Sequence, residues 1–397
     1  MFILSSSFFL LVASIGLLVT VTPLKATLLG FSSLAIGVIG SAYFAGMLAG
    51  SLMAPALIRR AGHIRAHAGF VALAIAGALL MPILVGPWEW AVIRVVTGFA
   101  AAGLYVVAEA WIVSSVSDAR RGQALALFQI VYYGGSAFGQ QLLILDETVT
   151  WQTFSLAAIL LAGSIPPLCF AAAAGPAVWK APRLRLTWLY SISPVGVLGA
   201  LMVGFAASSI WALMPVTASH LGYSPAEVGA IMTAIIVGGA ALQLPVGWLS
   251  DRIDRRWVLL CAAIPALALA VLIWFLGRPE IVVACLLTGA MGGTTLVQYA
   301  VSVAHANDRA GPEHAIEISS ALLLIYCVGA VLGPVLATGL TRRDPADLFL
   351  FIGAVQAVFA VFIVYRMMKR GAPSTGAKFS DETIPPGTKL ATSSADE

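Results

Sequence analysis

Charged side chains are scarce in this 397-residue sequence. Asp, Glu, Lys and Arg make up only 10% of it, whereas 60% of the residues are hydrophobic. Soluble domains usually contain about 25% charged and roughly 45–50% apolar residues. The shortage of charge therefore excludes a chain built from water-soluble domains. It indicates an integral membrane protein with several spans.

Cysteine is also rare. Cys169, Cys261, Cys285 and Cys327 all fall inside apolar runs, and their spacing matches neither a zinc site nor a disulfide framework. We interpret them as packing residues. The sequence also lacks a nucleophile–base pair, a metal-ligand cluster and a phosphate loop. We therefore expect no enzyme activity, no metal, no cofactor and no nucleic-acid partner.

Apolar windows of about twenty residues recur twelve times, each long enough to span a bilayer as a helix. They lie near 3–24, 35–58, 66–86, 90–114, 123–145, 154–175, 194–219, 226–249, 257–277, 280–304, 315–340 and 346–368. The first window lacks a basic flank and a small-residue cleavage site, so we expect a retained helix rather than a signal peptide.

The basic residues are distributed unevenly between the two sides of these spans. With the N-terminus inside, seventeen of the 22 Lys and Arg residues fall in cytoplasmic segments, four fall outside, and Arg94 is within a span. The positive-inside rule then places both termini in the cytoplasm. We expect a multi-pass protein of the bacterial inner membrane, surrounded by the lipid bilayer and present as a monomer.

The second half of the sequence repeats the first at a shift of 192–194 residues. The matched pairs are Pro23 and Pro215, Gly30 and Gly222, Ser32 and Ser224, Gly37 and Gly229, Gly46 and Gly238, Tyr132 and Tyr326, Gly135 and Gly329, and Gly139 and Gly333. Duplication of six spans predicts two pseudo-symmetric all-helical halves with a cavity between them. We assign 1–175 and 194–369 to the halves, 176–193 to a cytoplasmic linker and 370–397 to a disordered tail.

The fourth window contains both an arginine and a carboxylate. Ionised groups at this depth cost at least a few kcal/mol each by insertion scales, so Arg94 and Glu109 are candidate functional residues. They share one helix face but lie roughly 22 Å apart along the axis, so they cannot pair directly. Two roles stay open for each. Glu109 either binds a proton or closes an internal hydrogen-bond network, and Arg94 either serves transport or braces a helix crossing.

Three motifs carry a resemblance to a known family. The string Gly247-x-Leu-x-Asp251-Arg252-x-x-Arg255-Arg256 resembles the signature loop of the major facilitator superfamily. The equivalent first-half loop departs from it, with Pro55 in place of the first glycine and Arg59 in place of the aspartate. Arg94-x-x-x-Gly98-x-x-x-x-Gly103 resembles the family's fourth-helix motif, and Gly333-Pro334 resembles its glycine–proline motif.

The order of Glu109, Tyr132-Tyr133 and Phe138-Gly139-Gln140 is similar to the YcaD-like branch of this superfamily. The resemblance implies secondary active transport by alternating access with ion coupling, most often to protons. It also implies that Asp251, Arg252, Arg255 and Arg256 form a conformational lock. We take Glu109 as the candidate proton site, with Arg94 as its partner in coupling.

The expected lining of the central cavity is aromatic and rich in amides, with little charge. It comprises Tyr43, Tyr105, Gln129, Tyr132, Tyr133, Gln140, Trp211, Gln298, Tyr299 and Tyr326. Such a lining favours a small organic substrate that is neutral or weakly charged and aromatic, such as a flavin-like vitamin taken up. A multidrug or metabolite efflux pump and a non-transporting receptor on the same scaffold stay open. We expect most of the five histidines, which lie at helix ends and in loops, to be solvated or to contact lipid headgroups.

Overall fold

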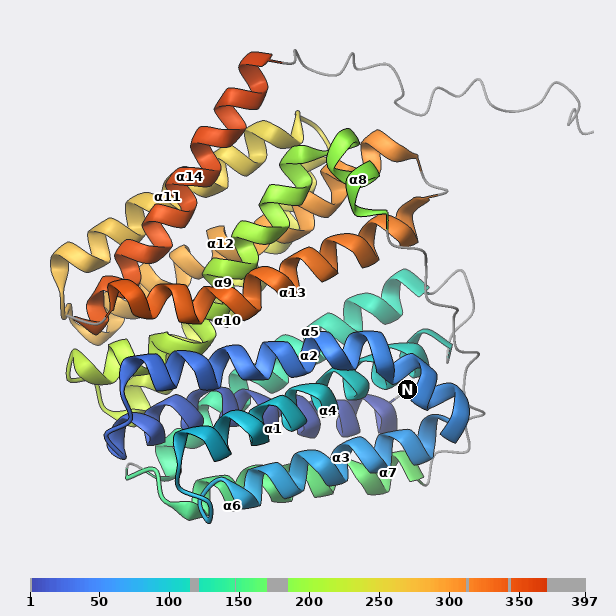
Figure 1. Ribbon diagram of the computed structural model, residues 1–397, viewed down its shortest axis with the longest axis vertical. Coiled ribbons are helices and arrows are strands. Elements are labelled where there is room, and N and C mark those ends of the chain that lie inside the picture. The colour runs from blue at the N-terminus through green and yellow to red at the C-terminus, as the bar shows by residue number, and fades with distance from the viewer. Residues whose placement is uncertain are drawn as a thin grey trace, which may run out of the picture.

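A computed structural model describes residues 2–114, 121–146, 148–169, 185–311, 314–341 and 344–369, and this part of the chain is helical and contains no strand (Figure 1). The first half comprises α1 (Phe2–Leu28), α2 (Ser33–Ala61), α3 (His63–Leu80), α4 (Pro87–Ser114), α5 (Arg121–Gln141), η2 (Leu142–Leu145), α6 (Trp151–Gly163) and α7 (Ile165–Cys169). The short helix α8 (Leu186–Ile192) lies in the linker. The second half comprises α9 (Pro194–His220), α10 (Pro225–Ser250), α11 (Arg255–Leu276), α12 (Ile281–Ala310), α13 (Ala315–Leu340), η4 (Pro345–Asp347) and α14 (Leu348–Lys369).

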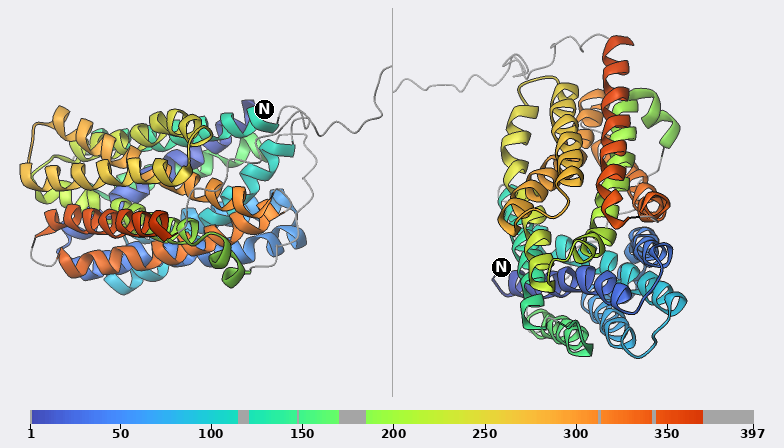
Figure 2. Two further views of the ribbon diagram at one scale, coloured as in Figure 1. Left: turned by 90° about the horizontal axis from the view of Figure 1, so that it is seen from above. Right: turned by 90° about the vertical axis from the view of Figure 1, so that its left-hand side faces the viewer.

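Twelve spans in two halves account for this architecture. Within the described ranges, ten helices are long and apolar enough to cross a membrane. The other two spans are α5 and the pair α6–α7, which breaks where Pro166 and Pro167 follow Ser164. Figure 2 shows the halves stacked on each other, one running from blue to green and the other from light green to red. Most of the assigned linker and the whole 370–397 tail lie outside the described residues.

Equivalent sequence signals start the second helix of each half. Ser32 caps α2 by accepting a hydrogen bond from the Ala35 amide, and Ser224 caps α10 in a full capping box with Glu227. Gly30 and Gly222 precede these caps with φ of 74° and 86°, a conformation that favours glycine. The duplicated residues therefore fix the same tight turn twice.

The helix crossings are duplicated as well, and glycine makes each of them possible. A Cβ added at Gly46 would collide with the backbone oxygen of Val95, and one at Gly238 would collide with that of Gly289. Small residues let helix backbones approach this closely in membranes. The crossings of α1 with α5 and of α9 with α13 are equivalent in the same way. A Cβ at Gly139 would collide with the backbone oxygen of Ala13, and one at Gly333 would collide with that of Phe205. The two halves thus share one packing plan.

The halves meet mainly at the end of the bundle opposite the linker. There a Cβ on Gly40 of α2 would lie 2.5 Å from the Cβ of Ala212 on α9, and one on Gly37 would lie 3.0 Å from the Pro334 oxygen on α13. One continuous apolar core crosses from half to half in this region. Toward the linker end, α2 and α13 diverge (Figure 1). The described residues thus form a bundle closed at one end and spread at the other.

Candidate functional site: a central cavity between the halves

A cavity of about 170 Å³ lies between the two halves. Its walls come from α1, α2, α4 and α5 of the first half and from α9 and α13 of the second. A solute in this position would contact both halves at once. Movement of one half against the other would then change its access to the two ends of the bundle.

Seven of the twelve residues predicted for coupling and substrate binding line this cavity. They are Tyr43, Arg94, Tyr105, Tyr132, Gln140, Trp211 and Tyr326. The lining also contains Thr22, Phe44, Met47, Ser136 and Cys327. Ser136 lies one helical turn from both Tyr132 and Gln140 on α5. No sequence signal pointed to Thr22 or Cys327, which lie in apolar runs.

Five predicted residues lie outside this lining. Glu109 is one of them and is described below. Tyr133 donates a hydrogen bond to the Gln243 Oε1 at 2.7 Å and so links α5 to α10 across the halves. Gln298 is fully buried and donates to Gln356 on α14, which directs it into the second half. Tyr299 packs on Tyr326 at 5.2 Å between ring centroids, and Gln129 is half-buried on α5.

Arg94 provides the positive charge of the cavity. It is 7% exposed, and its Cζ lies 4.0 Å from the centre of the Tyr43 ring. Among the described residues that line the cavity, Arg94 is the one charged residue. The close α2–α4 crossing sets this pair, because a Cβ on Gly98 would collide with the Tyr43 oxygen. A cation over an aromatic face is stabilised, most strongly where water is excluded.

Glu109 lies one helical turn beyond Tyr105 on the same face of α4, toward the linker end. Its side chain is exposed. Among the described residues, no cation lies within 4.0 Å of its carboxylate. The structure therefore separates the buried arginine of the cavity from an exposed carboxylate nearer the mouth of the bundle.

The aromatic side chains form two groups on opposite sides of the cavity. Tyr105 and Tyr132 pack edge to face at 5.9 Å in the first half, and Tyr132 continues to Tyr133 at 5.5 Å. Tyr326 supplies the facing ring from α13. Gln140 lines the wall, although its amide already bonds the Gly16 oxygen and the Thr20 hydroxyl of α1. The rings rather than the amides therefore dominate the accessible surface.

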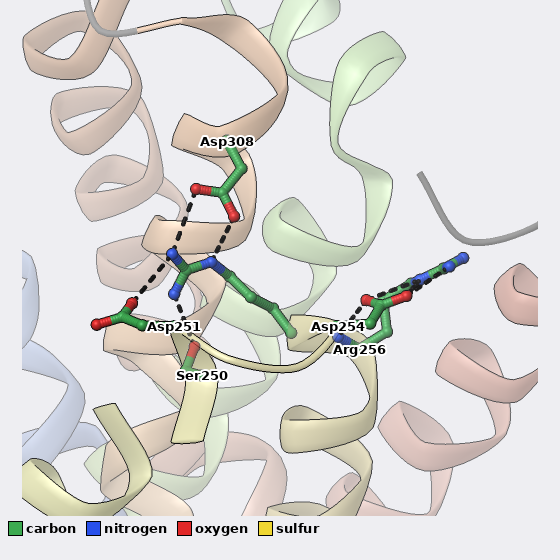
Figure 3. Close-up of polar contacts among 6 residues, drawn as sticks. Ser250, Asp251, Asp254, Arg256 and Asp308 are labelled. Atoms are coloured by element: carbon green, nitrogen blue, oxygen red, sulfur yellow. Dashed lines mark hydrogen bonds and ion pairs between the residues drawn. The ribbon is translucent and has the colours of Figure 1, made fainter. Parts of the chain in front are cut away.

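A network of ion pairs occupies the linker end of the second half (Figure 3). Arg255 donates to Asp308 at 2.5 Å and to the Ser250 hydroxyl at 2.7 Å, and it lies 3.3 Å from Asp251. These contacts join the α10–α11 turn to the end of α12. Three of the four predicted lock residues, Asp251, Arg255 and Arg256, are therefore ion-paired, and the pairs named here join residues of the second half.

Two further lock residues complete this turn. Arg256 is almost fully buried and donates to Asp254 at 2.7 Å. Burial alone would raise the pKa of Asp254. The hydrogen bonds from Arg256 nevertheless hold this pKa below its ordinary value. Arg252 differs, because its guanidinium stacks 3.5 Å above the ring of exposed Trp248. This exposed aromatic and cation pair suits the headgroup layer.

The equivalent end of the first half is built differently. Arg59, Arg60 and Arg65 are exposed. His63 and His67 pack against Trp111, with ring centroids 5.9 and 6.3 Å apart. The expectation of mostly solvated histidines is wrong, since His63, His67 and His305 are at most 7% exposed. Their rings are buried because they fill gaps between helices of the same half.

These features define a multi-pass membrane transporter, and the chain belongs to the Major Facilitator Superfamily, whose family model matches residues 4–188 and 196–393. Its curated relatives include the uncharacterized MFS-type transporter YcaD of Escherichia coli (strain K12 / DH10B). That protein is 28% identical over 366 residues, which cover 91% of this chain and 94% of the relative. A similar transporter of Enterobacter sp. (strain 638) is 28% identical over 374 residues, covering 92% and 94%.

Solved structures share the fold at low sequence identity. The nucleoside transporter NupG superposes with a TM-score of 0.77 at 13% identity, covering 93% of this chain and 99% of that one. A D-xylose–proton symporter gives a TM-score of 0.70 at 13% identity, covering 91% and 96%. This agreement confirms the expected all-helical, two-half architecture. At such identities the likeness concerns the fold alone.

Proposed function

We propose that this protein is a secondary active transporter that moves a small aromatic solute, neutral or weakly charged, by alternating access. The central cavity carries the proposal, because both halves contribute its walls and each half supplies aromatic rings to its lining. Ring faces stack on flat solutes, and tyrosine hydroxyls bond their edges. Rocking of the halves about this cavity would expose the solute to each side in turn.

The proposed setting is the bacterial inner membrane, with the linker end in the cytoplasm. The excess of Lys and Arg in the segments on that side supports this orientation. The closed end, at Gly37, Gly40 and Pro334, would then face outward. In this orientation the conformation described is open toward the cytoplasm.

Glu109 is the proposed proton-coupling residue. It lies on the same helix face as Arg94 and Tyr105, without an ion-pair partner among the residues that the structure describes. Its exposed position allows exchange of protons with water at the spread end. A carboxylate that gains and loses a proton during the cycle would link the pH gradient to the movement of the halves. Arg94 would take part in the same cycle through its contact with the solute in the central cavity.

Transport assays with purified protein in liposomes test this function. Accumulation of radiolabelled solute with acid outside indicates symport, and accumulation with acid inside indicates antiport and hence efflux. Glu109→Gln should abolish gradient-driven accumulation but retain exchange of solute between the two sides, since exchange needs no net proton movement. Full accumulation by Glu109→Gln would remove this residue from coupling. Specific binding without any flux would favour a receptor.

A further inference from the structure

Arg94 has no counter-charge in the described part of the chain. Its side chain is more than nine-tenths buried, and its Nε has no hydrogen-bond partner. No carboxylate among the described residues lies within 4.0 Å of it. A buried guanidinium without hydrogen bonds and without an anion is strongly unfavourable. The site is therefore electrostatically incomplete without a ligand.

The position of Tyr43 determines which part of the guanidinium is free to bind. The ring covers one face at 4.0 Å and supplies attraction but no negative charge. The N–H groups point outward in the plane of the guanidinium, away from a partner stacked on its face. A planar carboxylate binds this edge through two parallel hydrogen bonds, one to each oxygen. The stacking thus leaves open the geometry used for carboxylate recognition.

A second, smaller cavity lies on the other side of Arg94, inside the first half. Its volume is about 20 Å³, and Thr97, Leu104 and Leu161 are among its walls. This space suits a single water molecule. A water could accept one N–H bond but would not neutralise the charge. The counter-charge must therefore come from the central cavity, on which Arg94 also borders.

We propose that Arg94 binds the carboxylate of the transported solute, and that the solute is an aromatic monocarboxylate. This inference rests on the proposed transport function and narrows its substrate class. One cation, with no carboxylate among the cavity-lining residues, matches a single negative charge. With the carboxylate on Arg94, the ring extends among Tyr105, Tyr132 and Tyr326, where it can stack.

Binding to the purified full-length protein provides the test. The probes are one-ring and two-ring aromatic monocarboxylates, including phenylacetate and indole-3-acetate, each paired with its neutral amide at neutral pH. Binding is measured by the concentration-dependent rise in Tm and by protection of Cys327, which lines the cavity, from a maleimide. The labelling uses a variant in which the other three cysteines are replaced by serine. We expect at least one acid to bind about tenfold or more tightly than its amide.

Variants at position 94 separate recognition of charge from a structural role. Arg94→Met should reduce the preference for acid over amide to about onefold. Arg94→Lys should keep a preference for the acid that is weaker than in the wild type, because lysine retains the positive charge but lacks the two parallel donors of the guanidinium. Thr288→Val, at the equivalent position of the second half and away from the cavity, should keep the wild-type preference. If Arg94→Met does not fold, the wild-type and Lys proteins still give the acid-to-amide ratio.

The outcomes distinguish this inference from the transport function. Equal binding of acids and amides to the wild type, or no binding of any acid, would overturn the carboxylate site. Selective binding of acids without exchange in liposomes would leave the site intact and remove the transport function. Exchange of neutral aromatics with no advantage for acids would retain transport and remove the carboxylate site.

Discussion

The two halves of this protein share one backbone plan but distribute their charges differently. The first half carries a buried arginine at the central cavity and exposed arginines at its linker end. The second half has no charged residue in that cavity lining and concentrates its ion pairs in the α10–α11 turn. Helix packing therefore constrains where the backbone goes, whereas charge is free to specialise once the duplicated scaffold is stable.

This division suggests different tasks for the halves. A single cation on one wall orients an asymmetric solute, because only one end of the solute can supply the counter-charge. Ion pairs confined to the other half stiffen a helical hairpin without touching the cavity. Substitutions at equivalent positions should therefore have unequal effects on transport but similar effects on stability wherever glycine contacts are involved.

The largest expected difference concerns Arg94 and its equivalent, Thr288. Arg94→Thr should lower uptake of the solute about a hundredfold or more, in line with the roughly 2–5 kcal/mol lost when one partner of a buried charge pair is removed. Thr288→Val should change uptake by less than about twofold, because its hydroxyl donates to the Ala284 and Cys285 oxygens of its own helix. Initial rates in liposomes, normalised to the amount of inserted protein, measure both. Equal losses would mean that the halves are functionally symmetric.

The glycine crossings should behave alike in the two halves. Gly46→Ala and Gly238→Ala each place a Cβ against a backbone oxygen, so each should reduce stability by about 1–3 kcal/mol. Gly69→Ala is the matched control, since a Cβ there meets nothing within 4 Å, and it should stabilise α3 by roughly 0.5–1 kcal/mol. Thermal unfolding in detergent measures all three. A tolerated Gly238→Ala beside a damaging Gly46→Ala would contradict a shared packing plan.

These crossings also explain why much of the fold could be predicted from the sequence. Helix spans follow from the length of apolar runs, and a duplicated glycine must serve the same backbone approach in both copies. Residues at these close backbone contacts therefore recur at equivalent positions of the two halves, and the repeat can be recognised in the sequence.

The remaining features depend on helix rotation and on distant contacts, which one sequence does not specify. Gln298 belongs to a polar face of α12, but that face packs on Gln356 of α14 rather than on the cavity. Asp308 lies 53 residues from Arg255, and nothing local marks it as the partner. Cys327 follows Tyr326 in an apolar run, so its place on the cavity was not apparent.

A smaller difference is expected at the linker end. Arg255→Ala removes the ion pair with Asp308 and should lower stability by about 1 kcal/mol, because Asp308 is more than half exposed and solvent screens the pair. Arg59→Ala in the first half should have no measurable effect, since Arg59 is exposed and has no acidic partner within 4.0 Å among the described residues. The Tm values of the wild type and Arg255→Ala should differ at low salt and converge at high salt. Persistence of the full difference at high salt would indicate a packing role instead.

The smallest expected effect concerns the loops that close each half away from the linker. Asp146 accepts hydrogen bonds from Thr148, Thr150 and Thr153, whereas Asp344 caps η4 through the Ala346 amide. Partial burial alone would raise the pKa of Asp146. The hydrogen bonds from Thr153, Thr150 and Thr148 nevertheless hold this pKa below its ordinary value.

The sign of the resulting pH dependence follows from that lowered pKa. The carboxylate of Asp146 stabilises the fold above its unfolded pKa of about 3.9, and this contribution is lost as the pH falls toward the folded value. Asp146→Asn should therefore lower Tm at neutral pH, and its difference from wild type should shrink below about pH 4. Asp344→Asn should show a smaller difference at neutral pH, since Asp344 caps a single turn. A constant difference for Asp146→Asn across this range would mean that the loop depends on shape rather than on the charge, since fully buried Val149 already holds a φ of 50° there.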